Sequence, residues 1–209
     1  MGLAISSTSP RSTLPWRRRA ERARKPVSAS DFPALARCSV VVAPGLNDSG
    51  PQHWQTHWQQ LFPRFTRIRL DDWSRPDLDA WARAIVETAL TQQKPVIVVA
   101  HSFGCLGAIK AARLQSGLIA GALLVAPAEP AKFGLDAQLD RIAPDFPSVL
   151  VMSEDDPWLA PERAWHWSLQ WGSQLLSLGA AGHVNAQSGH RRWHEGLRAL
   201  EQLCRRVVN

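Results

Sequence analysis

Short runs of apolar residues alternate with longer amphipathic stretches along the chain from Cys38 onward. The apolar runs have the length of β-strands, and each is followed by a segment long enough to carry the chain back across a sheet. This alternation is typical of a parallel sheet with crossover helices, an α/β fold. The predicted strands are residues 39–43, 66–70, 96–100, 122–126, 149–152 and 174–178.

Helical periodicity fills most of the remaining chain. The predicted helices are residues 52–61, 78–92, 104–115, 161–171 and 189–207. Residues 129–147 carry neither pattern, and this stretch has the length of a small lid or an irregular crossover. A large cap domain would need more chain. The sequence therefore predicts one compact domain over residues 37–209, with about six mostly parallel strands, helices on both faces and a minimal lid.

The basic charge of the chain is concentrated at its N-terminus. The net charge is +6, and residues 1–36 contribute seven basic and two acidic side chains, or +5. The rest of the chain holds 17 basic and 16 acidic side chains and is nearly neutral. This distribution offers no basic groove for phosphates, so no nucleic-acid partner is expected. Residues 1–36 lack apolar periodicity, which predicts a disordered tail, with a targeting segment or an over-extended translation start as alternatives.

The cysteines and the length of the apolar runs bear on the location of the protein in the cell. Cys38, Cys105 and Cys204 are odd in number, lie far apart in the sequence and lack the spacing of a metal site. We interpret them as reduced thiols of a cytoplasmic protein. No apolar run approaches the roughly 20 residues that span a membrane, and residues 1–36 lack the apolar core of a secretory signal. No membrane partner is expected.

The third apolar run ends in Ala-His-Ser-Phe-Gly, residues 100–104. Small residues two positions before and two positions after Ser102 are typical of a serine on a strained strand-to-helix turn, where bulk would clash with the neighbouring strand or helix. Such a turn exposes one hydroxyl above the end of a sheet. A serine that merely caps the following helix is the alternative, but capping does not require small residues on both sides.

A base and an acid follow Ser102 in the chain. His183 lies in a Gly-rich loop after the last predicted strand, where an imidazole is able to act as a general base. Ser-Glu-Asp-Asp-Pro (153–157) follows the preceding strand, and an aspartate at this point orients the imidazole. The order Ser, Asp, His is that of the α/β-hydrolase triad. Asp156 is our choice for the acid, with Asp155 as the alternative.

Catalysis by such a triad also needs two backbone N–H groups aimed at the charge that develops on the substrate oxygen. We expect Phe103, next to Ser102, to supply one of these oxyanion-hole donors. Leu46, in the loop after the first strand, is the candidate for the other because Gly45 lets the backbone turn inward. That loop lacks the spacing of phosphate-binding and dinucleotide-binding loops, so no cofactor is expected. His101 adjoins the serine but is expected to pack, not react.

Histidines and tryptophans are the remaining candidates for a ligand site. His53 and His57 lie four residues apart, as do His190 and His194, but neither pair has a third ligand at metal-site spacing, so no metal is expected. The chain contains 10 tryptophans, and aromatic residues at helical spacing usually belong to the core. The candidates for a substrate-binding wall are those nearest in sequence to the site motifs, namely Trp54, Trp73 and Trp158.

Four segments of the chain carry a family resemblance. They are Val-Val-Ala-Pro-Gly-Leu-Asn-Asp-Ser-Gly-Pro-Gln-His-Trp-Gln (41–55), Ala-His-Ser-Phe-Gly-Cys (100–105), Ser-Glu-Asp-Asp-Pro-Trp (153–158) and Gly-His (182–183). Together they resemble the YdeN and retinoblastoma-binding protein 9 family of small serine hydrolases. The resemblance implies Ser102, Asp156 and His183 as the triad of a compact, lid-poor α/β-hydrolase, and it supplies no substrate.

The sequence favours a serine hydrolase of carboxylic esters or related acyl compounds that forms an acyl-enzyme at Ser102. A peptidase is the first alternative among enzymes, and an acyl transferase, in which another nucleophile captures the same acyl-enzyme, is the next. A non-catalytic binding protein of the same fold is the alternative outside enzymes, but all three triad positions are filled. The expected partner is a small-molecule acyl substrate.

Overall fold

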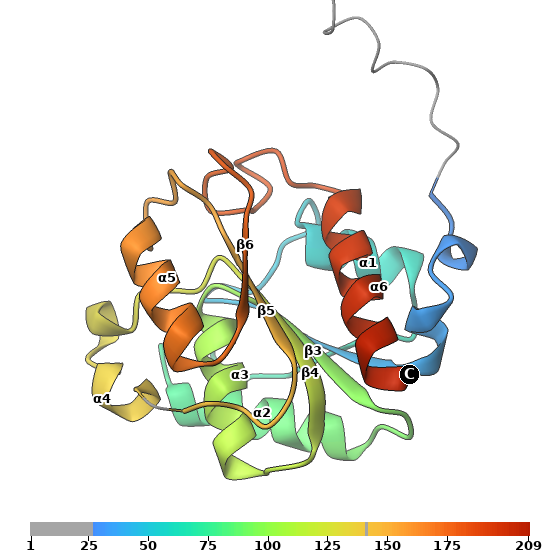
Figure 1. Ribbon diagram of the computed structural model, residues 1–209, viewed down its shortest axis with the longest axis horizontal. Helices are drawn as coiled ribbons and strands as arrows, with labels where there is room; N and C mark the ends of the chain where they lie inside the picture. Colours follow the sequence, from blue (N-terminus) through green and yellow to red (C-terminus); the bar gives the residue numbers. More distant parts are fainter. Residues whose placement is uncertain (1–26, 141) are drawn as a thin grey trace, which may run out of the picture.

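One sheet of six strands forms the centre of the protein in a computed structural model that describes residues 27–140 and 142–209 (Figure 1). The strands are β1 (Ser39–Ala43), β2 (Thr66–Arg67), β3 (Val96–His101), β4 (Ile119–Val125), β5 (Ser148–Met152) and β6 (Gln174–Ser177). Every pair of neighbouring strands is parallel, in the order β2-β1-β3-β4-β5-β6. The predicted α/β sheet is confirmed.

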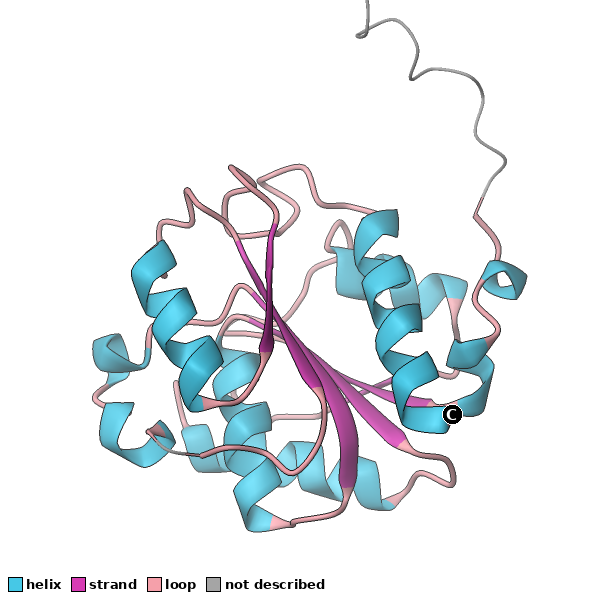
Figure 2. Cartoon of the chain, viewed as in Figure 1, coloured by secondary structure: helices cyan, strands magenta, loops and turns pink. Residues whose placement is uncertain are grey.

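Helices cover both faces of the sheet, as Figures 1 and 2 show. One face carries α1 (Trp54–Leu61) and α6 (His194–Val208), and the other carries α2 (Leu78–Leu90), α3 (Phe103–Leu114) and α5 (Pro161–Gln170). Shorter elements are η2 (Ala29–Asp31), η3 (Ala34–Arg37), η4 (Pro130–Phe133) and α4 (Asp136–Leu139). Within the described ranges, no helix has both the length and the apolar character to cross a membrane.

Alternating side chains of the strands supply both cores. Val42 of β1 belongs to the core beneath α1 and α6, whereas Val41 belongs to the core beneath α2, α3 and α5. Both residues are 0–1 % exposed. Because successive strand residues point to opposite faces, a strand covered on both sides is apolar throughout. This is why the strands read as continuous apolar runs in the sequence.

The crevice at the carboxyl ends of β1 and β3 is where this topology favours a ligand. The chain runs from β1 outward to β2 at one edge, and then returns to β3 and continues to the other edge. Ligands of open α/β sheets bind at such a switch point, outside the carboxyl ends of the strands. The loop after β1 and the turn after β3 therefore meet where a site is expected.

The last helix begins at His194, not at residue 189 as predicted. Trp193 directly precedes it with a left-handed backbone, φ 33°, and its buried ring stacks on Trp58 with the centroids 5.7 Å apart. A Cβ on Gly196 would collide with the Trp193 ring, so only glycine leaves room for it. The packing of Trp193 therefore sets the start of α6.

The second strand is also shorter than predicted, with two residues instead of 66–70. β2 pairs only with β1, and β1 ends at Ala43 because Pro44 has no N–H to continue the ladder. After the pairing, the Ile68 amide donates to the Val42 carbonyl at 3.0 Å, and the Ile68 side chain enters the core beneath α2. β2 therefore ends where β1, its pairing partner, ends.

Residues 129–147 contain two short helices, η4 and α4, which corrects the prediction of a stretch without either. The Glu129 side chain accepts a hydrogen bond from the Ala131 amide at 3.2 Å, and Pro130 occupies the first turn of η4. Leu139 of α4 is fully buried. Local capping and one buried leucine stabilise these helices. Neither feature produces a helical periodicity of apolar residues in the sequence.

Residues 27–36 pack on the domain, which corrects the predicted N-terminal tail. Leu35 is fully buried, and the Glu201 carboxylate of α6 accepts hydrogen bonds from the amides of Ala34 and Leu35, both at 3.0 Å. A buried amide needs such a partner, so this contact allows the segment to be buried. The other residues of the predicted tail, 1–26, lie outside the described part of the chain.

Deleting residues 1–36 is expected to lower the free energy of unfolding by at least about 3 kcal/mol more than deleting residues 1–26. The longer deletion removes the buried side chains of Phe32 and Leu35, each worth about 1.5–3 kcal/mol, and it leaves Glu201 without two amide donors. Urea denaturation of the two truncated proteins measures the difference. Equal unfolding free energies would show that the intervening segment does not stabilise the fold.

Two of the cysteines meet although they are far apart in the sequence. Cys38 precedes β1, Cys204 lies on α6, and both belong to the same core as free thiols. A hydrogen bond between the two thiols lowers the pKa of Cys38 and raises the pKa of Cys204. Cys105 lies in the other core, where burial raises its pKa well above the ordinary value.

Candidate active site

Ser102 lies in the turn between β3 and α3. Its backbone has φ 52° and ψ −122°, a conformation that is strained for a residue other than glycine. Ser102 occupies the N-cap position of α3, but its side chain makes no hydrogen bond that caps the helix. Ser102 instead lines a cavity above the sheet. This backbone conformation is typical of a serine presented on a sharp strand-to-helix turn.

Small residues allow this turn to lie directly against β1. A Cβ on Gly104 would collide with the carbonyl oxygen of Ala43, and a Cβ on Gly45 would lie 2.8 Å from the Cβ of Ser102. Ala100 is fully buried and pairs with Ala43 in the parallel ladder. The loop after β1 and the turn after β3 are therefore in direct contact at Ser102.

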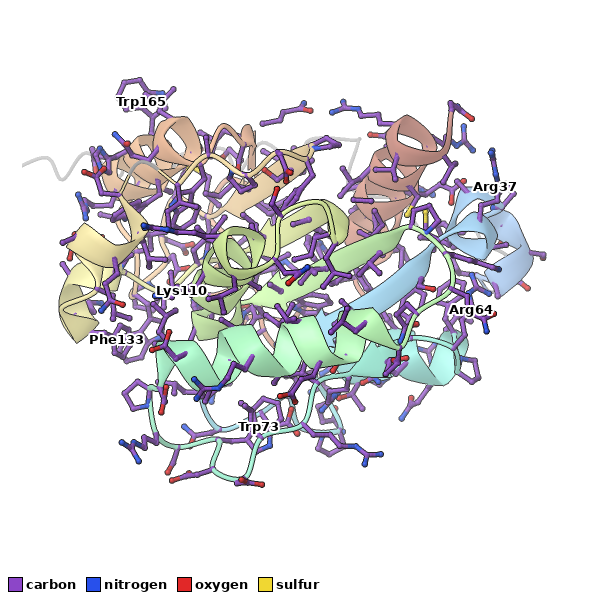
Figure 3. The ribbon with its side chains drawn as sticks, turned by 90° about the horizontal axis from the view of Figure 1, so that it is seen from below. Arg37, Arg64, Trp73, Lys110, Phe133 and Trp165 are labelled. Atoms are coloured by element: carbon purple, nitrogen blue, oxygen red, sulfur yellow. The ribbon has the colours of Figure 1, made fainter. Side chains whose placement is uncertain are left out.

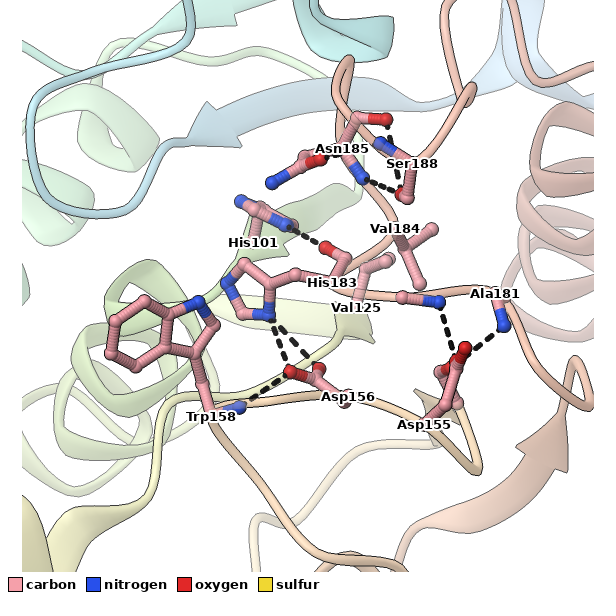
Figure 4. Close-up of polar contacts among 12 residues, drawn as sticks. His101, Val125, Asp155, Asp156, Trp158, Ala181, His183, Val184, Asn185 and Ser188 are labelled. Carbon is pink, nitrogen blue, oxygen red and sulfur yellow. Dashed lines mark hydrogen bonds and ion pairs between the residues drawn. The ribbon is translucent and has the colours of Figure 1, made fainter.

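His183 in the loop after β6 is held by Asp156 in the loop after β5, as Figure 4 shows. Nδ1 of His183 lies 3.0 Å from Oδ1 and 2.9 Å from Oδ2 of Asp156. The His183 side chain is 10 % exposed and that of Asp156 is 2 % exposed, so water is largely excluded from the contact. Oδ1 of Asp156 also accepts from the Trp158 amide at 2.9 Å. With a fixed acceptor at Nδ1, Nε2 is left to act on a substrate.

Asp155, the alternative acid, holds the loop and does not contact the imidazole. Its Oδ1 accepts hydrogen bonds from Oγ of Ser153 and from the amide of Gly182, both at 2.7 Å. These hydrogen bonds lower the pKa of Asp155 below its ordinary value. Because Gly182 directly precedes His183, Asp155 fixes the backbone that carries the histidine (Figure 4).

His101 supports the same loop from the sheet side. Its side chain is buried, and burial lowers its pKa well below the ordinary value, so the ring is neutral. Nε2 of His101 lies 2.9 Å from the backbone oxygen of His183 and donates to it, because a carbonyl only accepts. His101 packs as predicted, and its contact with His183 adds a positioning role that the sequence pattern did not indicate.

A cavity of about 340 Å³ brings Ser102 and His183 together. No hydrogen bond joins their side chains within the described residues, and contacts of this kind are often longer before a substrate binds. Leu46 and Trp158, two of the residues predicted for the site, also line the cavity. The other lining residues are Gly45, Asn47, Asp48, His53, His101, Ala128, Glu129, Lys132, Phe133 and Asn185.

Two of the three predicted aromatic wall residues do not line the cavity. Trp54 is fully buried in the core, where its Nε1 donates to the Val184 carbonyl at 2.8 Å. Trp73 packs edge-on against Trp81 of α2, with the centroids 5.7 Å apart. The prediction from proximity in sequence to a site motif is wrong for both tryptophans, because the side chain of each points toward a core. Phe133 of η4, which carried no sequence signal, takes a place in the wall.

The amides of Leu46 and Phe103 lie on the two loops that meet at Ser102. Within the described residues, neither amide donates to another protein group, whereas the next amide in the first loop, that of Asn47, donates to the Trp73 carbonyl at 2.8 Å. A Cβ on Gly45 would lie 3.3 Å from the Phe103 nitrogen, which shows how closely the loops approach. Two amides without protein acceptors at this point are able to serve a substrate oxygen.

His53 and His57, four residues apart in the sequence, contact different partners. His53 caps α1, where its Nδ1 accepts from the Gln55 amide at 3.3 Å, and it lines the cavity. Nδ1 of His57 contacts Gln60 instead, at 3.3 Å. Among residues 27–140 and 142–209, no group of three or more metal-ligating side chains is arranged around a common point.

Comparison with known proteins identifies the family of the chain. Residues 40–202 match a family model described as Serine hydrolase. The crystal structure of a YdeN-like hydrolase from Pectobacterium atrosepticum is 37 % identical over 85 % of this chain and 96 % of that chain, with a TM-score of 0.81. Among curated proteins, none matches the chain.

Two more distant structures share the fold. The ydeN gene product of B. subtilis is 18 % identical over 78 % of this chain and 97 % of its own, with a TM-score of 0.62. Est1E from Butyrivibrio proteoclasticus, solved with ferulic acid, is 15 % identical over 87 % of this chain and 93 % of its own, also with a TM-score of 0.62. By the family match and the identity to the Pectobacterium structure, the chain belongs to the serine hydrolase family, as a YdeN-like member with the α/β-hydrolase fold.

Proposed function

We propose that this hydrolase cleaves carboxylic esters through an acyl-enzyme on Ser102, with His183 as general base and Asp156 as the acid that orients it. The observation that carries the proposal is the contact of His183 Nδ1 with both oxygens of Asp156 at the cavity that Ser102 lines. The strained turn at Ser102 supports its role as nucleophile. The family match supports hydrolysis as the reaction class.

In the first half-reaction, Oγ of Ser102 attacks the acyl carbon while Nε2 of His183 accepts the hydroxyl proton. The tetrahedral intermediate then collapses, and the leaving alcohol takes that proton from His183. In the second half-reaction, a water molecule gives a proton to His183 as its oxygen attacks the acyl carbon. The bond to Ser102 breaks, the serine oxygen takes the proton back, and the carboxylic acid is released.

The negative charge on the tetrahedral intermediate falls on the former carbonyl oxygen. We assign the amides of Leu46 and Phe103 as its donors, because both lack protein acceptors and lie on the loops that meet at Ser102. Fixed donors of this kind require no rearrangement when the charge develops, and one of them is typically worth about 10²–10³ in kcat. His101 and Asp155 are positioning residues in this scheme, since each acts on the His183 loop.

Ester turnover is expected to be highest for short acyl chains and to fall gradually as the chain lengthens. A cavity of about 340 Å³ is near the lower end of ligand pockets, which span about 300–1,000 Å³. A methylene changes discrimination by only about 1–3 kcal/mol in an apolar pocket, so the decline should be graded. The measurement is kcat/KM for 4-nitrophenyl esters from acetate to palmitate. A value that rises up to palmitate would contradict the proposed pocket.

A matched pair of tryptophan variants tests whether this cavity sets the preference. Trp158 lines the cavity and is 55 % exposed, whereas Trp165 projects outward from α5 and is 58 % exposed (Figure 3). Trp158→Ala removes part of the wall and should shift the optimum to longer chains. Trp165→Ala should leave the profile unchanged, and an equal shift in both variants would argue for binding elsewhere.

A further inference from the structure

The carboxylates that line the cavity are both neutralised by arginines outside the lining. Oδ1 of Asp48 lies 2.8 Å from Nη1 of Arg67. Glu129 accepts two hydrogen bonds from Arg163, both at 2.8 Å. Burial by itself would raise the pKa of Glu129, but these hydrogen bonds bring that pKa below the ordinary value. Each acid is therefore paired with an arginine, and the two pairs add little net charge to the cavity.

Lys132 is the cation of the lining that lacks an acidic partner. Its Nζ donates to the Trp158 carbonyl at 2.9 Å and lies 5.1 Å from the centroid of the Trp158 ring. Within the described part of the chain, no carboxylate lies within ion-pair distance of Lys132. The neighbouring acids Glu129 and Asp136 form ion pairs with Arg163 instead. An ammonium group has three donors, so two N–H groups of Lys132 are left for a ligand.

His53 adds a second unused donor to the same lining. Burial lowers its pKa to about 3, so the ring is neutral, and Nδ1 accepts from the Gln55 amide. The proton of the ring is then on Nε2, which is a buried side-chain atom without a hydrogen-bond partner in the described residues. The lining therefore offers donors without protein acceptors on both Lys132 and His53, which suits a ligand that carries acceptor oxygens.

We propose that the cavity selects esters whose acyl group ends in a carboxylate, and that Lys132 binds this carboxylate while Trp158 and Phe133 contact the chain that precedes it. The Trp158 ring lies near both Lys132 and His183. Its centroid is 5.1 Å from Nζ of Lys132 and 6.4 Å from the centroid of the His183 ring. The inference rests on the proposed function, since Ser102 must react with the ester carbonyl of the same molecule.

The test compares two esters of equal shape and different charge. Monomethyl succinate carries the terminal carboxylate, and methyl succinamate replaces it with a neutral amide; the glutarate pair extends both by one carbon. For the wild-type protein at low ionic strength, kcat/KM should favour the carboxylate ester about tenfold, as a charge-assisted hydrogen bond allows. The ratio should fall toward one as salt approaches about 1 M, where charges at this exposed position are screened.

Three variants locate the preference at Lys132. Lys132→Met should bring the ratio of the two kcat/KM values to about one, and Lys132→Arg should retain most of the preference because it keeps the charge. The matched control is Lys94→Met, since Nζ of Lys94 also donates to a backbone carbonyl, that of Ala36 at 2.6 Å, away from the cavity. Lys94→Met should leave the ratio at the wild-type value. A ratio near one in the wild type, or an unchanged ratio in Lys132→Met, would overturn the proposal.

Binding to a protein that cannot turn the ester over separates this inference from the proposed function. Calorimetry with Ser102→Ala should show tighter binding of monomethyl succinate than of methyl succinamate, and Lys132→Met in the same background should abolish the difference. If neither ester is hydrolysed but this difference in binding is found, the charge selection holds and the esterase proposal fails. Equal binding of both esters to Ser102→Ala would reject the charge selection, whatever the outcome for hydrolysis.

Discussion

Ser102→Ala is expected to lower kcat for ester hydrolysis by on the order of 10⁶-fold, the size of the loss when a serine hydrolase loses its nucleophile. In our scheme Oγ of Ser102 is the atom that bonds to the acyl carbon, and among the described residues that line the cavity no other side chain carries a hydroxyl or a thiol. The variant should also lose labelling by a fluorophosphonate, which intact-mass spectrometry detects as one covalent adduct on the wild type. Both measurements report the same atom by independent chemistry.

The fold should survive this substitution, because alanine is smaller than serine and has the same backbone restrictions at φ 52°. Thermal unfolding of the variant checks that point. Ser116→Ala is the matched control, since Ser116 is an exposed serine whose Oγ contacts Asp145 at 2.7 Å, outside the cavity. It should keep full turnover and full labelling. An adduct that persists on Ser102→Ala would assign the nucleophile to another residue.

Asp156→Asn is expected to lower kcat by on the order of 10⁴-fold, as loss of the orienting acid does in serine proteases. Both carboxylate oxygens of Asp156 face Nδ1 of His183, at 3.0 and 2.9 Å. An asparagine at this position is able to turn its NH₂ toward Nδ1, which favours the tautomer with the proton on Nε2. That tautomer cannot accept the proton of Ser102, so the base is lost while the geometry remains.

Asp155→Asn is the matched control, because it makes the same chemical change one residue away. Asp155 contacts Ser153 and the Gly182 amide but not the imidazole, and an asparagine oxygen is still able to accept both hydrogen bonds. We expect a loss of less than about tenfold in kcat, since neutral hydrogen bonds of this kind contribute about 0.5–1.5 kcal/mol. A larger loss from Asp155→Asn than from Asp156→Asn would transfer the orienting role to Asp155.

The sheet and the meeting of the three residues of the proposed triad were predictable because they depend on local pattern and on one general rule. Continuous apolar runs indicated strands covered on both faces, and the structure places helices on both faces. Ser102, Asp156 and His183 each follow a different strand of one parallel sheet. The carboxyl ends of such strands lie at the same edge, so residues far apart in the chain were expected to meet there.

The ends of the elements depended on contacts that no local pattern contains. α6 starts at His194 because the Trp193 ring packs over Gly196 and against Trp58. Residues 27–36 are ordered because Glu201, far along the chain, accepts from two of their amides. In each case one partner, Trp58 or Glu201, lies on a distant segment, and pattern recognition within one segment has no access to it.

The residues of the site show most clearly what the sequence determined and what the tertiary structure determined. Sequence alone determined which residues carry the proposed chemistry, because a serine between small residues and an Asp-Asp-Pro turn are local signals. Only the tertiary structure shows that Asp156 contacts the imidazole of His183 and Asp155 does not, since adjacent loop side chains point in different directions. Only the tertiary structure also placed Lys132 in the cavity and Trp54 in the core. A cavity is formed by side chains from many segments, and their relative directions are determined by packing of the whole chain.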